Sequence, residues 1–307
     1  MSELNSEQVK ANLLENAKQS IQLGVEDYTL AKDDHKRNIS AVRNIFAGLL
    51  LLYKYKLLLE SPQGKPYFYI SRPKSYIDMY KDSFGLETPK ITVDTHGIKK
   101  VFEHLNIEIN SNSFDGINKL RNNIEHFYNV DDVDILNLTE KSFELIDDFY
   151  EDNLLCYQQE SLREFLGDDT YRVFLNNREI YQKVLKQCQS SFADIDFPST
   201  YLKTKFLQEM SCPYCNSNLI KYKSGDYPDL RLSCMSCAMG DNLDKEEVLG
   251  LTHHSIKDGG DFREECPECG EYTIFIDNIC LECGFEKNPN IDYEREEYLQ
   301  YLRDKDD

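Results

Sequence analysis

The sequence predicts a mainly α-helical domain followed by two small β modules built around cysteines, and three observations lead to this prediction. Apolar residues recur at helical spacing through most of the first 200 residues. Four C-x-x-C pairs follow one another beyond residue 210, and the stretches between paired motifs are typical of short β-strands. We therefore expect a helical bundle over residues 1–200, cysteine modules over 205–245 and 260–290, and an acidic helical tail over 291–307.

The composition is that of a folded, acidic protein. Its 307 residues include 20 Tyr and 16 Phe, which can build an aromatic core although only 40% of the residues are hydrophobic. The net charge of -20 and the pI of about 4.7 argue against broad, non-specific binding of nucleic acid, which needs Lys and Arg to neutralise phosphates. A local basic cleft, or a basic partner, is compatible with this charge.

No segment of the sequence predicts export or membrane insertion. The N-terminus lacks an apolar stretch after a basic one, so we expect no signal peptide. The longest apolar run, residues 46–59, is interrupted by Lys54 and Lys56 and is shorter than the ~20 residues of a membrane span. We therefore expect a soluble, cytoplasmic protein without membrane contacts.

The elements of the helical part are expected in a definite order. The first helix spans residues 5–31, where apolar residues such as Leu13, Ala17 and Ile21 recur at helical spacing. We expect further helices at 33–60, 75–81, 96–105, 114–128 and 142–150, a short strand at 66–70, and one or two helices within 159–194. A domain boundary is expected near residues 196–204.

The helix expected over residues 114–128 separates an apolar face from a polar one. At about 100° per residue, its apolar stripe is formed by Ile117, Leu120, Ile124 and Phe127. Asn122 and His126 are four residues apart and share the face nearly opposite this stripe. Arg121 and Glu125, also four apart, flank that face and could form an ordinary ion pair worth a few tenths of a kcal/mol. His126 could equally be an ordinary surface histidine.

The stretch Arg121-Asn122-Asn123-Ile124-Glu125-His126 resembles the R-x4-6-H signature of the HEPN superfamily, in which Asn often follows the Arg directly. An earlier stretch, residues 38–57, is similar to the family's A-G-x-E-L-x-x-K helix. It matches at four positions, Ala47, Gly48, Leu51 and Lys54. Leu50 stands where many relatives carry Glu, which leaves the role of that acidic group open. The resemblance covers roughly residues 30–130.

The resemblance implies an all-α, metal-independent endoribonuclease, of a kind that typically serves as a toxin or antiviral-defence effector. It also implies a homodimer that meets at the motif helix and pools two Arg121 and two His126 in one cleft. His126 would transfer protons, Arg121 would stabilise phosphate charge, and Asn122 would orient one of these groups. RNA cleaved by its own 2′-hydroxyl would leave a 2′,3′-cyclic phosphate and a 5′-hydroxyl. A non-catalytic helical scaffold remains the alternative.

Eight of the ten cysteines form two sets with the spacing of four-cysteine zinc ribbons. The predicted ligands are Cys212, Cys215, Cys234 and Cys237 in the first ribbon and Cys266, Cys269, Cys280 and Cys283 in the second. Four thiolates leave no open position for water, so we expect two structural Zn²⁺ ions per chain. The remaining Cys156 and Cys188 are expected to be buried thiols. His253-His254 is a rival ligand pair between the ribbons.

The two ribbons differ in the surface that they offer to partners. Strands are expected at residues 218–223 in the first ribbon and 272–276 in the second, where Asp277-Asn278 suits a turn. Lys221, Lys223 and Arg231 form a thin basic patch in the first ribbon, interleaved with Tyr222, which is weakly consistent with nucleic-acid contact. The second ribbon is acidic, which favours a protein partner or regulator, or a scaffolding role.

Overall fold

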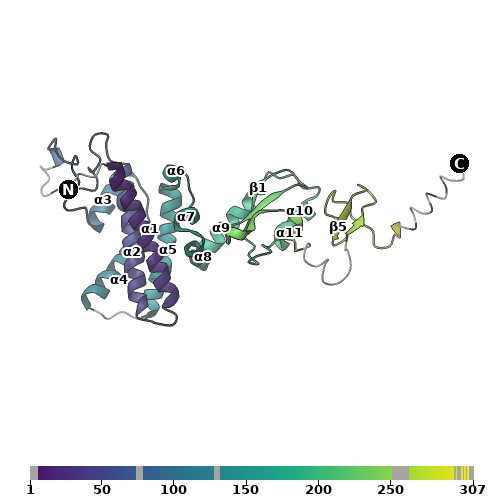
Figure 1. The fold of residues 1–307 in the computed structure, drawn as a ribbon, viewed down its shortest axis with the longest axis horizontal. Helices are drawn as coiled ribbons and strands as arrows, with labels where there is room; N and C mark the ends of the chain where they lie inside the picture. Colours follow the sequence, from purple (N-terminus) through teal and green to yellow (C-terminus); the bar gives the residue numbers. More distant parts are fainter. Residues whose placement is uncertain are drawn as a thin grey trace. The chain divides into compact units, whose positions relative to one another are not determined.

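The computed structural model describes residues 6–73, 79–127, 132–250 and 263–293 and positions 295, 299, 301 and 303, without the side chains of residues 125–127, 132–134 and 238. The chain divides into two compact units, Met1–Tyr181 and Gln182–Asp307. The first contains helices only among its described regular elements, and the second contains helices and two small antiparallel sheets (Figure 1). The expected fold class, mainly helical with two small β modules at the C-terminal end, is confirmed.

The first unit is a bundle of helices of very different lengths. Its elements are α1 (Ser6–Leu30), α2 (Arg37–Leu59), α3 (Thr95–Leu105), α4 (Ser111–Phe127), α5 (Asp132–Asn153), α6 (Leu155–Gln158), α7 (Leu162–Leu166) and α8 (Asp168–Phe174). Helix α9 (Arg178–Ser190) crosses the division between the units. The carboxylate of Asp94 begins α3 by accepting a hydrogen bond from the Gly97 amide at 2.9 Å, as expected of an N-cap.

Helices α1 and α2 pack closely side by side because glycines stand at their contact (Figure 1). A Cβ added to Gly48 would lie 2.5 Å from Cγ1 of Ile21, and one added to Gly24 would lie 2.5 Å from Cγ1 of Ile45. Ile21 and Ile45 are fully buried. The glycine of the A-G stretch thus has a packing role in this fold.

Aromatic side chains fill the centre of the first unit. The buried ring of Tyr53 on α2 lies 5.2 Å from that of Phe102, 5.3 Å from Phe114 and 4.4 Å from Phe149, measured between centroids. These partners come from α3, α4 and α5 respectively. One aromatic cluster therefore holds four helices together, as the high Tyr and Phe content suggests.

Several boundaries differ from the sequence prediction. Residues 66–70 form turns in place of the expected strand, because no strand among the described residues pairs with this stretch and the neighbouring Ser71 makes only a single bridge, with Thr92. Helix α4 starts at Ser111, where the side chain of Asn110 accepts a hydrogen bond from the Ser113 amide. Helix α5 starts about ten residues earlier than expected, and three helices, α7 to α9, occupy the region of one or two. Most of the helix expected at 75–81 lies outside the described residues.

The second unit combines α10 (Thr200–Glu209) with two three-stranded sheets. The first ribbon contains β1 (Ile220–Ser224), β2 (Arg231–Cys234), the short helix η2 (Ala238–Gly240), β3 (Asp241–Leu243) and α11 (Lys245–Val248), and the second contains β4 (Arg263–Glu265), β5 (Tyr272–Ile276) and β6 (Ile279–Cys280). Their strand orders are β1-β2-β3 and β4-β5-β6. Helix α10 was not predicted. The break expected at 197–200 is its start, where Ser199 caps the helix.

The core of the first ribbon is continuous with the preceding helices. Phe192 and Phe206 are fully buried in one cluster with Ile220 and Leu232 of the sheet. The Tyr222 amide also donates a hydrogen bond to the Ser191 hydroxyl, at 2.9 Å. The first ribbon is therefore built on α10 and the segment that follows α9.

Candidate functional site

The first set of predicted metal ligands converges in the structure. The four sulfur atoms of Cys212, Cys215, Cys234 and Cys237 all lie within 4.8 Å of one another. The Sγ atoms of Cys212 and Cys237 are 3.7 Å apart, and so are those of Cys215 and Cys234. A tetrahedral ion with metal–sulfur bonds of about 2.3 Å places its sulfurs about 3.8 Å apart, so the cluster fits such an ion.

The second set forms an equivalent cluster in the second ribbon. Its sulfurs also lie within 4.8 Å of one another. The Sγ atoms of Cys266 and Cys283 are 3.7 Å apart, and those of Cys269 and Cys280 are 3.9 Å apart. These separations are far above the ~2.05 Å of a disulfide bond and match metal coordination. The chain therefore has two four-cysteine clusters at metal-binding distances.

Backbone amides support the sulfur atoms in both clusters. The Ser236 amide lies 3.3 Å from the sulfur of Cys234, and the amides of Glu282 and Cys283 each lie 3.4 Å from that of Cys280. Burial raises the pKa of the Cys280 thiol, and the nearby amides oppose that shift. A bound cation would complete the stabilisation of the thiolates.

The two remaining cysteines behave differently from each other. Cys188 is buried as expected, and burial raises the pKa of its thiol to about 12. Cys156 is exposed on the short helix α6, so the expectation that it is buried was wrong. The apolar spacing that suggested burial is interrupted there, because α5 ends at Asn153. The rival ligand pair His253-His254 lies outside the described residues.

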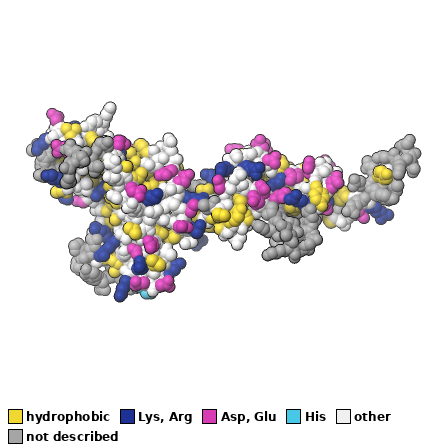
Figure 2. Space-filling model, in the orientation of Figure 1, with side chains coloured by type: hydrophobic (Ala, Val, Ile, Leu, Met, Phe, Trp, Pro, Cys, Tyr) yellow, Lys and Arg dark blue, Asp and Glu magenta, His cyan; other side chains and the backbone are white. Residues whose placement is uncertain are grey.

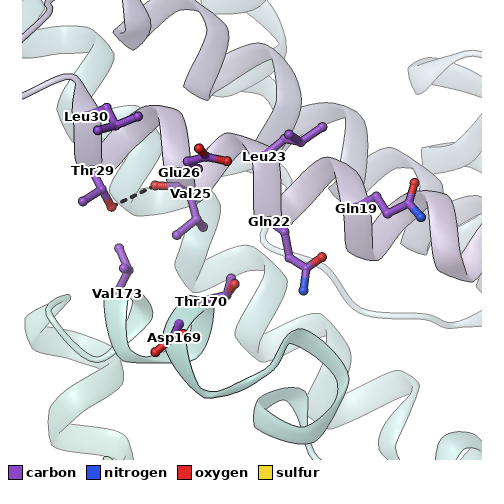
Figure 3. Close-up of a pocket in the computed structure, with 10 residues that line it drawn as sticks. All are labelled: Gln19, Gln22, Leu23, Val25, Glu26, Thr29, Leu30, Asp169, Thr170 and Val173. Carbon is purple, nitrogen blue, oxygen red and sulfur yellow. Dashed lines mark hydrogen bonds between the residues drawn. The ribbon is translucent and has the colours of Figure 1, made fainter.

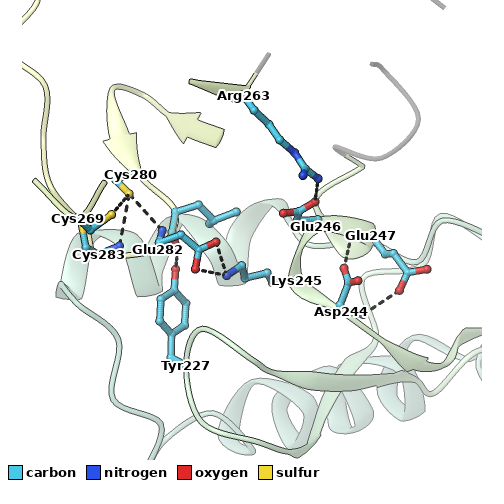
Figure 4. A network of polar contacts seen from close by, with 11 residues as sticks. Tyr227, Asp244, Lys245, Glu246, Glu247, Arg263, Cys269, Cys280, Glu282 and Cys283 are labelled. Atoms are coloured by element: carbon cyan, nitrogen blue, oxygen red, sulfur yellow. Dashed lines mark hydrogen bonds and ion pairs between the residues drawn. The ribbon is translucent and has the colours of Figure 1, made fainter. Parts of the chain in front are cut away.

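The second ribbon docks on the first through the cysteine loop that follows β6 (Figure 4). Nζ of Lys245 on α11 donates to both carboxylate oxygens of Glu282, at 2.7 and 2.8 Å. The Tyr227 hydroxyl donates to the carbonyl of Leu281. Lys245 is only 7% exposed, and its Nζ lies 5.5 Å from the centroid of the Tyr227 ring. The charged pair is thus largely removed from solvent.

Apolar and polar contacts extend the same interface. Leu281 and Ile279 are buried together with Leu202 of α10. Asp277, in the turn between β5 and β6, pairs with Nζ of Lys205 at 2.7 Å. Sequence reasoning missed this docking, since each charged residue alone is indistinguishable from a solvated one.

Helix α4, which carries the predicted catalytic residues, buries the apolar stripe that its sequence predicts. Ile117, Leu120 and Ile124 of α4 are at most 5% exposed, and the last two pack with Val42 of α2 and with α5. Asn122 is exposed, as expected for the polar face. Arg121 is half-buried and has an interaction partner. His126 lies within the helical backbone, but its side chain and those of Glu125 and Phe127 lie outside the description.

The A-G-x-x-L-x-x-K stretch contributes a half-buried lysine as well as the glycine contact. Lys54 is half-buried and donates a hydrogen bond to the Thr92 hydroxyl at 3.0 Å. Burial lowers the pKa of its ammonium group. Leu50, at the position where Glu is frequent in the family, is half-buried. Lys54 therefore ties α2 to the segment that precedes α3.

The basic side chains of the first ribbon lie on the solvent face of its sheet. Lys221, Lys223 and Arg231 are exposed, and Lys223 pairs with Asp241 at 2.8 Å. Figure 2 shows basic and acidic side chains interspersed over this part of the surface. Tyr222 is half-buried, with its ring 6.1 Å from that of Phe192. The basic patch is therefore thin, and one of its charges is balanced.

A groove of about 730 Å³ lies between α1 and α8 (Figure 3). It is lined on one side by Leu23 and Leu30 of α1 and on the other by Val173 of α8. Two of its polar side chains already form hydrogen bonds within the bundle. The Gln22 amide donates to the Leu166 carbonyl at 2.8 Å, and the Thr29 hydroxyl donates to the Val25 carbonyl at 2.9 Å. The groove brings no cluster of titratable groups together.

Comparison of the chain with family models, with curated proteins and with solved structures finds no match. Among the described residues, no helix combines the length and the apolar character needed to cross a membrane.

Proposed function

We propose that the chain is a metal-independent endoribonuclease of HEPN type. The proposal rests on the difference between the two faces of α4. The apolar stripe of this helix is buried in the bundle, whereas Asn122 of the R-N-x-x-x-H stretch is exposed. A helix whose motif residues were needed for core packing could not offer them to a substrate. The helical class of the first unit also agrees with this superfamily.

The proposed chemistry needs proton transfer and charge stabilisation but no metal. His126 would accept the proton of the attacking 2′-hydroxyl or give one to the departing 5′-oxygen, since imidazole titrates near neutral pH. Arg121 would donate its planar N–H groups to the phosphate oxygens as negative charge develops. Asn122 would orient the histidine or the phosphate by hydrogen bonding. Two copies meeting at α4 would supply one histidine as acid and one as base.

The test is cleavage of total RNA by the purified full-length protein in a buffer without added divalent ions. We expect fragments ending in 2′,3′-cyclic phosphate and 5′-hydroxyl groups. His126→Ala should lower the rate by ~10²–10⁴, the range that positioned acid–base catalysis contributes. His35→Ala, which removes an exposed histidine outside the motif, is the matched control and should retain the native rate. Full activity of His126→Ala would refute the assignment.

The second candidate function is a non-catalytic scaffold whose ribbons bind a protein or a nucleic acid. The docking of the second ribbon on the first favours it, because a buried cluster and an ion pair join the two ribbons. Large apolar side chains are exposed at the first cysteine cluster, with Tyr214 55% and Met239 70% accessible. Absence of RNA cleavage by the native protein would favour this function.

We propose that the ion in both sites is Zn²⁺, with a structural role. Four cysteine sulfurs in tetrahedral separation form a donor set that Zn²⁺ prefers. Its binding would supply folding free energy to the second unit. No step of the proposed RNA cleavage uses the metal.

A further inference from the structure

One short loop of the second ribbon both carries cysteines of a metal cluster and makes the contact with the first ribbon (Figure 4). The loop contains Cys280 and Cys283, which belong to the second cluster. The residues between them, Leu281 and Glu282, provide the carbonyl and the carboxylate that a hydrogen bond and an ion pair join to the first ribbon. The same backbone conformation therefore places the sulfurs for an ion and the docking groups for the first ribbon.

The loop fits closely against the segments on which it docks. Gly284, directly after the second of these cysteines, has a positive φ of 75°, and a Cβ added there would lie 2.6 Å from Cβ of Pro198. The side chain of Leu281 is buried together with Leu202 of α10. A displacement of the loop would therefore break these contacts as well as the polar ones.

Hydrogen bonds connect the shape of the loop to its metal ligands. The amides of Glu282 and Cys283 each lie 3.4 Å from the sulfur of Cys280, and the Gly284 amide donates to the Cys280 carbonyl at 3.0 Å. Metal–sulfur bonds of about 2.3 Å would fix Cys280 and Cys283 relative to each other. Loss of the ion would remove this restraint from the loop that docks.

The second ribbon has little apolar core of its own to replace the ion. Among its described residues, the buried aliphatic side chains are Ile274, Ile279 and Leu281. Ile279 and Leu281 are buried in a cluster with Leu202 of α10, outside the ribbon. Modules below about 40 residues usually need a metal, disulfides or a partner surface to fold. The second ribbon therefore depends on its ion and on its docking together.

We propose that metal binding at the second cluster and docking of the second ribbon are coupled, so that loss of this ion releases the ribbon from the first one. The first ribbon stays folded, because its sheet packs on the fully buried Phe192 and Phe206. In the first cluster only Cys215 is exposed, whereas the second has an exposed Cys269 and a half-buried Cys283. The ion of the second cluster is therefore the first to leave, and the chain rearranges its ribbons as zinc becomes scarce.

The test is carbodiimide cross-linking of the full-length protein, read by mass spectrometry, after stepwise removal of zinc with a chelator. The reagent joins a paired carboxylate and ammonium group through an amide bond. We expect the yield of the cross-link between Lys245 and Glu282 to fall about tenfold once one of two ions has left, and to recover when zinc is added back before cross-linking. The cross-link between Lys223 and Asp241, a 2.8 Å pair within the first ribbon, is the internal control and should keep its yield.

A reciprocal test acts from the side of the first ribbon. Because coupling is mutual, weaker docking must weaken zinc binding at the second cluster. Tyr227→Phe with Lys245→Gln removes both polar docking groups without changing the second ribbon, and should lower this affinity at least about fivefold in competition with a chelator. Cys269→Ser abolishes the same binding step and so identifies it. The matched control, Lys223→Gln, breaks an exposed ion pair away from the docking loop and should leave both zinc affinities unchanged.

The inference rests on the proposed occupancy of both clusters by Zn²⁺ and not on RNA cleavage. A native chain that binds fewer than two ions would refute the zinc assignment and the coupling with it. Two bound ions together with an unchanged cross-link between Lys245 and Glu282 after loss of one ion would overturn the coupling alone. Equal weakening of zinc binding by the double variant and by Lys223→Gln would also overturn it.

Discussion

Gly48 is one of the two glycines that allow α1 and α2 to approach closely. A Cβ at Gly48 would lie 2.5 Å from Cγ1 of the buried Ile21 and 3.0 Å from the carbonyl oxygen of Ala17. We therefore expect Gly48→Ala to reduce the free energy of unfolding by about 1–3 kcal/mol, as overpacking does in other cores, although alanine favours helix formation.

The matched control for this prediction is another helical glycine, Gly116 of α4. Its added Cβ would meet only Cδ2 of Leu138, at an ordinary 3.7 Å. Gly116→Ala should therefore raise stability by about 0.5–1 kcal/mol. Urea unfolding of both variants measures the difference. Equal effects of the two substitutions would show that the contact with α1 does not limit the packing.

At the scale of elements, the docking of the second ribbon on α11 depends on a charged pair with little access to water. The side chain of Lys245 is 9% exposed and that of Glu282 is 23% exposed. Removing one partner of a buried ion pair leaves the other charge uncompensated and lowers the free energy of unfolding by ~3–5 kcal/mol. Because this pair is partly solvated, we expect about 2 kcal/mol for Glu282→Gln, measured by urea unfolding of the second unit.

The control for the charged pair is Glu268→Gln in the same ribbon. Glu268 is exposed and lies in the other cysteine loop, so its loss should change stability by less than about 0.5 kcal/mol. Protease cleavage within the second ribbon should be faster in Glu282→Gln than in this control. An unchanged cleavage rate would mean that Leu281 and its apolar neighbours hold the ribbon without the ion pair.

Elements defined by local spacing could be predicted from the sequence, whereas those defined by tertiary partners could not. Strand β5 and its turn at Asp277-Asn278 were predicted, and both turn residues have positive φ, of 49° and 66°. The buried stripe of α4 followed in the same way from helical periodicity. The aromatic stretch 66–70 has strand-like residues, but no strand in the described part of the chain pairs with it, and it forms turns.

The same distinction between local spacing and tertiary partners applies to the candidate sites. Both cysteine clusters follow from C-x-x-C spacing, because each half of a ligand set is local. The groove between α1 and α8 could not be predicted, because two segments distant in sequence bring its lining together. For the same reason, the partner of Lys245 is recognisable only in the folded second unit.

For the whole molecule, the metal content is a direct consequence of the two cysteine clusters. We expect two zinc ions per chain by elemental analysis, about one in Cys269→Ser, and two in the control Cys156→Ser, whose exposed thiol belongs to neither cluster. Metal binding at such sites contributes ~10–16 kcal/mol of apparent free energy near neutral pH. Strong chelation should therefore unfold the ribbons and leave the helical signal of the first unit. A content near one or none in the native chain would contradict this prediction.

The proposed nuclease activity requires a dimer, because one histidine cannot easily act as acid and base in the same step. The stripe of α4 is used within its own bundle, so contact between copies must involve the polar side that carries Asn122. A two-fold axis at α4 would bring the same residues of both chains together. Specific activity should then fall on dilution in step with the dimer fraction measured by ultracentrifugation. An excess of His126→Ala should also inhibit the native protein, since a mixed dimer retains only one of the two histidines. Constant activity per chain under conditions in which the monomer prevails would exclude the composite site.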